Sequence, residues 1–284
     1  MTQGNVEIRT MTSDDISLGM ELKNIAGWNQ LPADWQRLLA LEPDGCFVAT
    51  CDGVDVGTAT TTTYEDKFGW VAMVLVYPQY RRRGIGTALL YASIDYLEER
   101  VAAVKLDATP MGKKLYDTLG FVDEYIMERW LGRGREPLKV PDVEPITADL
   151  LPALCDFDRP MFGADRSRLL GMLVNEEPNT ALCIRDGGRI VAYGILRPGY
   201  RAAQIGPLVG LEPQSAERVF QALLAAAGDQ HIYNDMLLPN PHTAELLRKY
   251  GFEKQRYLIR MSRGDNRHPG HPQYIYAASG PAKG

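Results

Sequence analysis

The spacing of apolar residues changes repeatedly along the first half of the chain, and each change predicts a new element. Apolar residues spaced three and four apart indicate amphipathic helices, whereas short apolar or alternating runs indicate strands. Asp52-Gly53 is typical of a tight hairpin turn, and Pro78 ends a run because proline cannot donate to a strand ladder. The predicted elements are a helix (35–45), a strand (46–50), a hairpin (51–61), a strand (70–76), a helix (86–101) and a final strand and helix (103–121).

The same order of elements returns about 130 to 140 residues later, which indicates an internal duplication. Each copy has a helix, a strand, a glycine-containing hairpin, a strand ended by proline, a second helix and a closing strand and helix. Both closing helices stop at a glycine, as helix C-caps prefer. The second set comprises a helix (166–179), a strand (180–184), a hairpin (185–196), a strand (203–213), a helix (215–228) and a closing strand and helix (231–252).

Between the copies, residues 131–142 are rich in proline, glycine and charge and predict a linker. After residue 264 the helical period is lost, and the tail is predicted either to dock through its YIYA segment as a strand or to fray. We therefore expect domains at residues 1–130 and 143–264, followed by a C-terminal tail at 265–284.

Composition agrees with two ordinary globular units. The chain has 284 residues, 45% of them hydrophobic and 24% charged, and a formal net charge of −5. An acidic balance argues against a nucleic-acid-binding surface, and no apolar run approaches the roughly 20 residues that span a bilayer. The four cysteines show no CxxC spacing and no signal peptide precedes them, so we expect reduced thiols and a cytoplasmic protein.

Charge is concentrated between the strand at 70–76 and the helix that follows. Arg81, Arg82 and Arg83 precede Gly84 and Gly86, which open the helix. The first amides of a helix lack partners and the helix dipole is positive there, so this junction can hold an anion. The glycines let an oxygen-rich group approach the backbone, and the arginines surround it with donors. A diphosphate fits this arrangement.

The arginine-rich junction also has alternatives to an anion site of this kind. Three adjacent arginines are usually a solvated surface run, and the Walker pattern GxxxxGK[ST] is absent from the chain. A dinucleotide-binding oxidoreductase is an alternative, because Gly84 and Gly86 precede a helix and Asp107 follows about 20 residues later. Against it, Leu89 replaces the third small residue, and the strand ends well before the glycines.

The combination resembles the GNAT superfamily of acyl-CoA-dependent N-acyltransferases over nearly the whole chain. Residues 81–86 match the signature [RQ]xxGx[GA], and residues 115–121 resemble the second motif, LYxxxGF, one helix and one strand later. The resemblance implies an α/β (α+β) fold of two tandem domains, each a mixed, mostly antiparallel sheet flanked by helices. It also implies acetyl-CoA as co-substrate, without a metal.

The resemblance implies roles for individual residues. Tyr116 would face the thioester sulfur, and Thr109, where the family often has asparagine, would contact CoA. The strand backbone would bind pantetheine at Val74, Leu75 and Val76. The loop would bind the pyrophosphate at Arg81, Arg82, Arg83, Gly84, Ile85, Gly86 and Thr87.

Acylating an amine requires it to lose a proton. An alkylammonium with a pKa near 10.4 costs about 4.6 kcal/mol to deprotonate at pH 7, and residues 1–130 contain no histidine. Asp107 ranks first as the base, with Glu65 or Asp66 as alternatives, and each could instead be a surface acid. The amide of Val74 or Leu75 could stabilise the oxyanion. Tyr116 is either a core aromatic or the acid that protonates the thiolate, and the upstream motif favours the acid.

At the position of the arginine loop the second copy carries Glu212 and Glu217 and no glycine pair, so we expect it not to bind CoA. The second copy would form one side of the acceptor pocket or a homodimer interface. Trp28 and Trp35 could line a pocket for a small-molecule or lysine-type amine, or could simply be core residues. The predicted function is acetyl transfer from acetyl-CoA to a primary amine. The alternative from another class is a non-catalytic CoA-sensing or assembly protein.

Overall fold

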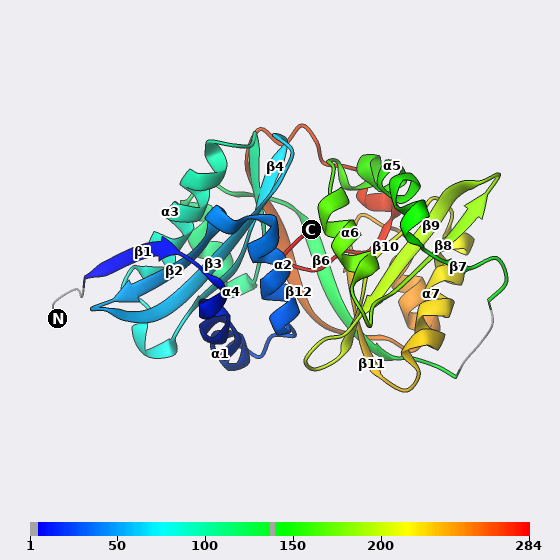
Figure 1. Cartoon of the computed structure of the whole chain (residues 1–284), viewed down its shortest axis with the longest axis horizontal. Coiled ribbons are helices and arrows are strands. Elements are labelled where there is room, and N and C mark those ends of the chain that lie inside the picture. The colour runs from blue at the N-terminus through cyan, green and yellow to red at the C-terminus, as the bar shows by residue number, and fades with distance from the viewer. Residues whose placement is uncertain (1–4, 137–139) are drawn as a thin grey trace.

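The structure, a computed structural model, describes residues 5–136 and 140–284, and its first half contains the elements that the sequence pattern predicts (Figure 1). Local chemistry explains several boundaries: Pro32 begins a helix, Gly27 at φ 71° ends one, and the Thr109 side chain caps another. In chain order the elements are β1 (Val6–Thr10), α1 (Ile16–Ala26), α2 (Pro32–Leu41), β2 (Cys46–Cys51), β3 (Val54–Tyr64), β4 (Phe68–Val76), α3 (Ile85–Glu98), β5 (Ala103–Ala108), α4 (Pro110–Thr118) and β6 (Val122–Arg133).

The second half repeats this order, which confirms the duplication of elements. The predicted linker at 131–142 is partly outside the described residues, and its first part continues β6 as far as Arg133. The second set is β7 (Glu144–Pro145), α5 (Leu151–Phe162), α6 (Ser167–Asn175), β8 (Thr180–Asp186), β9 (Arg189–Arg197), β10 (Ala203–Gly210), α7 (Pro213–Ala227), β11 (His231–Leu237), α8 (Thr243–Lys249), β12 (Glu253–Gly264) and β13 (Ile275–Ala277).

The strands form one continuous mixed sheet in the order β1-β2-β3-β4-β5-β12-β6-β11-β10-β9-β8-β7, with β13 added on β10. Most neighbours are antiparallel; β4 with β5 and β10 with β11 run parallel. This is the mixed, mostly antiparallel α/β sheet expected from the sequence. A doubly wound nucleotide-binding fold needs a mostly parallel sheet, so the fold does not support the dinucleotide alternative.

The two halves exchange their last strands. β12, from the second half, pairs with β5 of the first half, and β6, from the first half, pairs with β11 of the second. β6 and β12 also pair with each other along most of their length. Each half therefore completes its sheet with a strand from the other, and the two sheets are continuous across the middle of the molecule (Figure 1).

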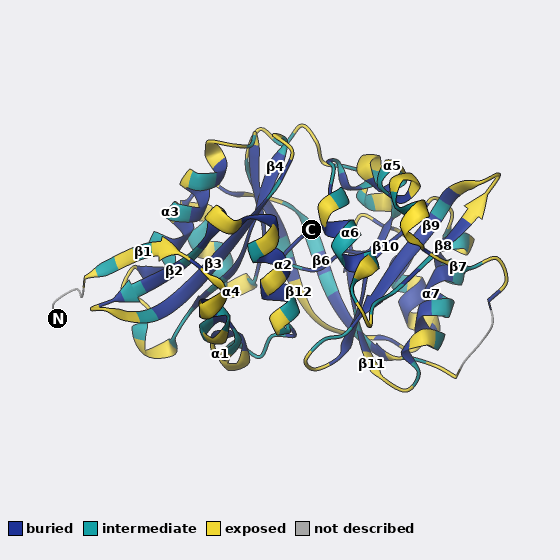
Figure 2. Ribbon diagram, viewed as in Figure 1, coloured by how far each residue is buried: buried dark blue, intermediate teal, exposed yellow. Residues whose placement is uncertain are grey.

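Helices cover both faces of the sheet in each half. In the first, α3 packs on β2, β3 and β4, while α1 packs on β3 and β4 and α2 on β3. In the second, α7 packs on β8, β9 and β10, α5 on β9, and α6 on β8. The strands between these layers are largely buried and the outer helix faces are exposed (Figure 2). The helix α2 contacts α6, so the halves meet through helices as well as through the sheet.

The C-terminal tail is docked throughout its last part. The predicted YIYA segment forms β13, and residues 278–284 continue into the space between the halves, where Figure 1 marks the C-terminal end of the chain. Ala278, Ser279, Ala282 and Lys283 are all at most 6% exposed. The structure thus shows the tail docked as a strand and not frayed.

Candidate active site

The strands β4 and β5 part after their first three pairs. Phe68 to Trp70 pair with Ala103 to Lys105, and beyond Trp70 the rest of β4 has no partner in β5. The separation coincides with a bulge in β4, where the pairing with β3 shifts register between Thr58 and Thr60. Backbone amides and carbonyls on the β5 side of β4 are therefore free of a strand ladder over residues 71–76.

Met73 is the bulged residue and has φ 51°, a left-handed conformation that costs a non-glycine residue about 1–3 kcal/mol. The side-chain hydroxyl of Thr58 donates to the carbonyl of Met73 at 2.9 Å and holds this conformation. Met73 and Leu75 are buried, and Val74 and Val76 are partly exposed. The part of β4 that the resemblance assigns to pantetheine is thus the part that separates from β5 while it still pairs with β3.

The arginine loop connects β4 to α3 and is exposed from Arg81 to Gly84. Gly84 is the N-cap of α3 at φ 81°, and no side chain in the described residues caps the helix there. An atom added at the Cβ position of Gly84 would meet nothing within 4 Å, so the approach to the first helical amides is open. Arg81 donates from its Nε to the carbonyl of Val76 at 3.0 Å, which ties the loop to the end of β4.

The remaining residues of the loop and of the first turn of α3 differ in their contacts and exposure. Arg82 has φ 60°, Arg83 lies over the Tyr80 ring at 5.2 Å, and Ile85 is buried as the first residue of α3. Gly86 and Thr87 are partly exposed in the first turn. The structure therefore brings the free part of β4, the three arginines and an uncapped helix start together.

Tyr116 lies on α4, which begins just after β5, and Thr109 immediately precedes this helix. Thr109 accepts a hydrogen bond from the amide of Gly112 at 3.1 Å and is the N-cap of this helix. The Tyr116 ring packs edge-on against Phe121, with ring centroids 6.0 Å apart. Burial raises the pKa of Tyr116 to about 12, which makes the phenol a weaker acid than its reference value implies.

The structure places Asp107 in a buried ion pair. Its two carboxylate oxygens accept hydrogen bonds from the guanidinium of Arg260 on β12, at 2.9 and 3.0 Å. Burial raises the pKa of Asp107, while Arg260 acts in the opposite direction. Because both oxygens are occupied and the side chain is fully buried, this geometry speaks against Asp107 as the free general base.

Glu65 also has bound partners. It lies in the turn between β3 and β4, accepts a hydrogen bond from the amide of Asp165 at 2.9 Å, and pairs with Lys67 at 2.8 Å and with Arg159. Burial would raise the pKa of Glu65, but the hydrogen bonds from Lys67 and the Asp165 amide outweigh it and lower the pKa to about 2. These contacts join the two halves and make Glu65 a poor base.

The two tryptophans differ in position. Trp35 on α2 is 0% exposed, and its ring lies so close to Gly19 that a Cβ there would be 2.8 Å away. Trp35 is therefore a core residue. Trp28, in the connection between α1 and α2, is partly exposed and packs on the same core.

A small polar cavity lies beside the β4 bulge, between the halves, and sequence reasoning missed its central residue, Asp34. Asp34 is buried on α2 and accepts hydrogen bonds from Arg37 at 2.7 Å, Arg197 at 3.2 Å and Lys283 at 3.0 Å. Its only local signal is an acid in a first helical turn, which is common. The cavity has a volume of about 20 Å³ and is lined by Asn29, Gln30, Asp34, Met73, Arg129, Arg197, Gln204, Gly280, Pro281, Ala282 and Lys283.

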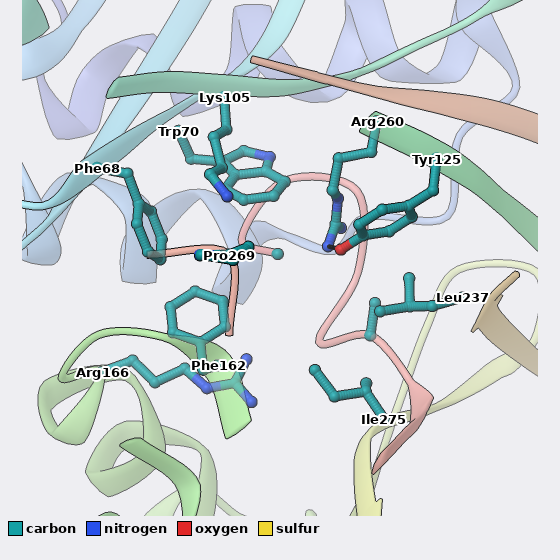
Figure 3. A pocket seen from close by; sticks show the side chains of 12 residues that line it. Phe68, Trp70, Lys105, Tyr125, Phe162, Arg166, Leu237, Arg260, Pro269 and Ile275 are labelled. Carbon is teal, nitrogen blue, oxygen red and sulfur yellow. Dashed lines mark hydrogen bonds between the residues drawn. The ribbon is translucent and has the colours of Figure 1, made fainter. Parts of the chain in front are cut away.

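A second, aromatic cavity of about 10 Å³ adjoins the same tail (Figure 3). Phe68, Trp70 and Phe162 line one side of it, and Arg260 and Tyr125 point into it from the exchanged strands β12 and β6. Arg260 lies over the Trp70 ring at 4.5 Å and donates to the Tyr125 hydroxyl at 3.0 Å. Both cavities are therefore closed by residues from both halves.

In the second half, the corresponding gap between strands is filled by the chain itself. β10 and β11 pair only over residues 203–205 and 232–234, and β13 then pairs with β10 where the strands part. At Gly206, a Cβ would lie 2.0 Å from the carbonyl oxygen of Ala278. No comparable space is left beside β10 among the residues that the structure describes.

Two further observations concern the described residues as a whole. No helix among them combines the length and the apolar character needed to cross a membrane. Their His, Cys, Asp and Glu side chains form no group of three or more that could hold a metal ion.

The chain is a mixed α/β protein in which two parallel strands part beside a glycine-containing loop at a helix start, and comparisons with known proteins identify its family. The family described as Acetyltransferase (GNAT) family matches residues 18–121, and the Acetyltransferase (GNAT) domain matches residues 154–277. The chain belongs to the GNAT N-acetyltransferases and carries two GNAT domains in tandem, the second of them degenerate at the loop that carries the motif in the first.

Similar proteins include the holothin acyltransferase of Pseudoalteromonas sp., which is 26% identical over 243 residues, or 84% of this chain and 81% of that one. The mycothiol acetyltransferase of Acidimicrobium ferrooxidans is 30% identical over 129 residues, or 39% of this chain and 42% of that one. A putative acetyltransferase from Pyrococcus horikoshii has a solved structure with a TM-score of 0.86 and 25% identity, covering 100% of this chain and 97% of that one.

Proposed function

We propose that the chain transfers an acetyl group from acetyl-CoA to a primary amine by direct attack within a ternary complex. The observation that carries this proposal is the β5-facing side of β4, which lacks a strand partner from the Met73 bulge to the arginine loop. Pantetheine pairs with residues 74–76 in place of a neighbouring strand, and the pyrophosphate lies on the open amides at the start of α3. The thioester then lies near Met73.

The catalytic unit consists of residues 1–130 together with β12, which supplies Arg260 beside β5. The amide of Val74 or Leu75 stabilises the oxyanion. Tyr116 donates to the departing sulfur. With a pKa near 12 against about 8.5 for a thiol, full proton transfer from Tyr116 costs roughly 5 kcal/mol, so its main contribution is a hydrogen bond to the developing thiolate.

The acceptor amine binds at the place beside Met73 and Asp34 that the Lys283 side chain occupies, because the remaining volume of about 20 Å³ holds only about one water molecule, and these surroundings lower the cost of deprotonation. The ammonium already present there, Lys283, has its pKa lowered to about 7 by burial and by the nearby charge of Arg197. An amine with such a pKa is about half neutral at pH 7, so most of the deprotonation cost is removed without a dedicated base. Desolvation takes the role for which the sequence suggested Asp107 or Glu65.

The same cavity defines the class of acceptor. Asp34 supplies the buried carboxylate, and Trp28 lies on the nearby connection between α1 and α2. Arg197 on β9 and Gln204 on β10 line the same cavity. The second domain therefore forms one side of the acceptor pocket. Because the cluster around Asp34 already carries more positive than negative charge, it favours the neutral form of the acceptor amine, free or on a lysine side chain.

The second domain does not bind CoA in this proposal. β13 takes the place beside β10 that pantetheine would need, and Glu212 is the N-cap of α7 where the first domain has Gly84. One acetyl-CoA per chain is the expected stoichiometry.

Calorimetric titration with acetyl-CoA, CoA and NAD tests the proposal. We expect one acetyl-CoA per chain, no NAD, and loss of acetyl-CoA binding in Gly84→Glu. The matched control is Gly53→Glu: Gly53 also has a positive φ, of 78°, and also has nothing within 4 Å of its Cβ position. It lies in the β2–β3 turn, so Gly53→Glu carries the same backbone strain and charge and should bind normally. Failure of the wild-type protein to bind acetyl-CoA would overturn the function.

A further inference from the structure

The tail after β13 enters the polar cavity and is held there by both halves. Arg197 donates to the carbonyl of Ser279 at 2.5 Å, Trp70 donates from its Nε1 to the carbonyl of Pro281 at 3.1 Å, and the Tyr64 hydroxyl donates to the carbonyl of Lys283 at 2.8 Å. The amide of Lys283 donates to the carbonyl of Gly280 at 3.0 Å, so the segment turns back on itself. This geometry points the Lys283 side chain at Asp34.

The cluster of charged side chains around Lys283 carries more positive than negative charge. Asp34 is shared by Arg37, Arg197 and Lys283, and Glu176 compensates only one of these charges, through its contact with Arg37. The two arginines keep their protons, because guanidinium groups do not deprotonate in proteins. Lys283 is the cation of this cluster that can become neutral, and it is 2% exposed. Its Nζ therefore reaches the nucleophilic form more easily than that of a surface lysine.

We infer that Lys283 is an internal acetylation site, modified by the active centre of its own chain. Lys283 and Met73 line the same cavity, and in the proposed function the thioester lies at Met73, so this inference rests on that function. A buried amine next to a bound thioester is held at a high effective concentration, which favours reaction within one molecule.

The reaction balances without another reactant. The neutral Nζ attacks the thioester carbonyl carbon, an amide C–N bond forms, and the C–S bond breaks. The CoA thiolate leaves and takes up the proton that the amine loses. The product, an uncharged amide, no longer pairs with Asp34, and the excess positive charge of the cluster is removed.

Isotope-labelled acetyl-CoA and peptide mass spectrometry test the inference on the full chain. We expect label on Lys283 at a rate per molecule that does not change with protein concentration, because the reaction is intramolecular. Lys23 is the internal control: it is also buried and has a pKa lowered mainly by burial, but it packs on the Tyr200 ring at 3.5 Å and is not among the residues that line the cavity. Lys283 should carry at least about tenfold more label than Lys23.

Two variants complete the test. Lys283→Arg keeps the charge beside Asp34 and should take no label while still binding acetyl-CoA, and Gly84→Glu should lose both binding and label. Spermidine and a lysine amide serve as external amine probes. Acetylation of a probe without label on Lys283 would overturn the inference and leave the function intact, whereas absence of acetyl-CoA binding would overturn both. Binding without label on Lys283 or on a probe, or equal label on Lys23, would also refute the inference.

Discussion

Asp107 on β5 and Arg260 on β12 form a two-point ion pair at 2.9 and 3.0 Å, although they are 153 residues apart in the chain. The pair joins the first half to the strand that it receives from the second. It also occupies both oxygens of the carboxylate that the sequence favours as a general base. Its main contribution is to hold the exchanged strand in register.

Asp107→Asn should lower the free energy of unfolding by about 3–5 kcal/mol, because it leaves the Arg260 charge buried without its counter-charge. Urea unfolding measures this loss. Replacing both residues, by Asp107→Leu with Arg260→Met, should cost less than the sum of the single changes. A stable Asp107→Asn variant that loses the acidic limb of the pH–rate profile would instead identify Asp107 as the base.

Tyr116→Phe should reduce kcat by about 10²-fold, the lower end of the range for acid catalysis, because the buried phenol is a weak acid. The Kd for acetyl-CoA should not change, since the ring keeps its packing on Phe121. Steady-state rates and calorimetry separate the two effects. Tyr91→Phe is the control: Tyr91 lies half-exposed on α3, and its hydroxyl should be dispensable. An unchanged rate in Tyr116→Phe would leave Tyr116 as a core aromatic.

Trp35→Ala and Trp28→Ala should separate packing from substrate binding. Trp35 is fully buried, so its truncation should cost about 3–5 kcal/mol of stability. Trp28 is partly exposed and precedes Asn29, which lines the proposed acceptor site, so Trp28→Ala should raise KM for the amine more than it lowers stability. Thermal unfolding and amine titrations provide the two measurements. An unchanged KM in Trp28→Ala would assign Trp28 to the core as well.

Glu65 should make stability depend on acid pH. Its pKa falls from the ordinary value of 4.5 to about 2 in the folded chain, so the folded state binds its proton less readily than the unfolded state. The resulting stabilisation is complete above pH 4.5 and disappears as the pH falls toward 2. Between pH 7 and pH 3, the wild type should lose more of its urea midpoint than Glu65→Gln does. Equal losses would show that the contacts of Glu65 with Lys67, Arg159 and Asp165 contribute nothing to stability.

Much of the molecule is determined by the sequence through local chemistry. Helical spacing, turn pairs such as Asp52-Gly53 and helix-ending glycines specify the order of elements in both halves, because these preferences act over a few residues. The arginine loop and the glycines that open α3 are likewise local, so an anion site could be predicted, and the family recognised, from a short stretch.

Only the tertiary structure decided the rest. Which strand lies beside β5 depends on packing between segments more than 100 residues apart, and β6 and β12 carry no local sign of their exchange. The sequence likewise gives no sign that Asp107 pairs with Arg260. It also gives no sign that Asp34 lies at the centre of the polar cavity, or that Lys283 reaches it there. The physical reason is that burial and the partner of a charge are set by surroundings assembled from distant segments, whereas residue type and spacing describe only neighbours in the chain.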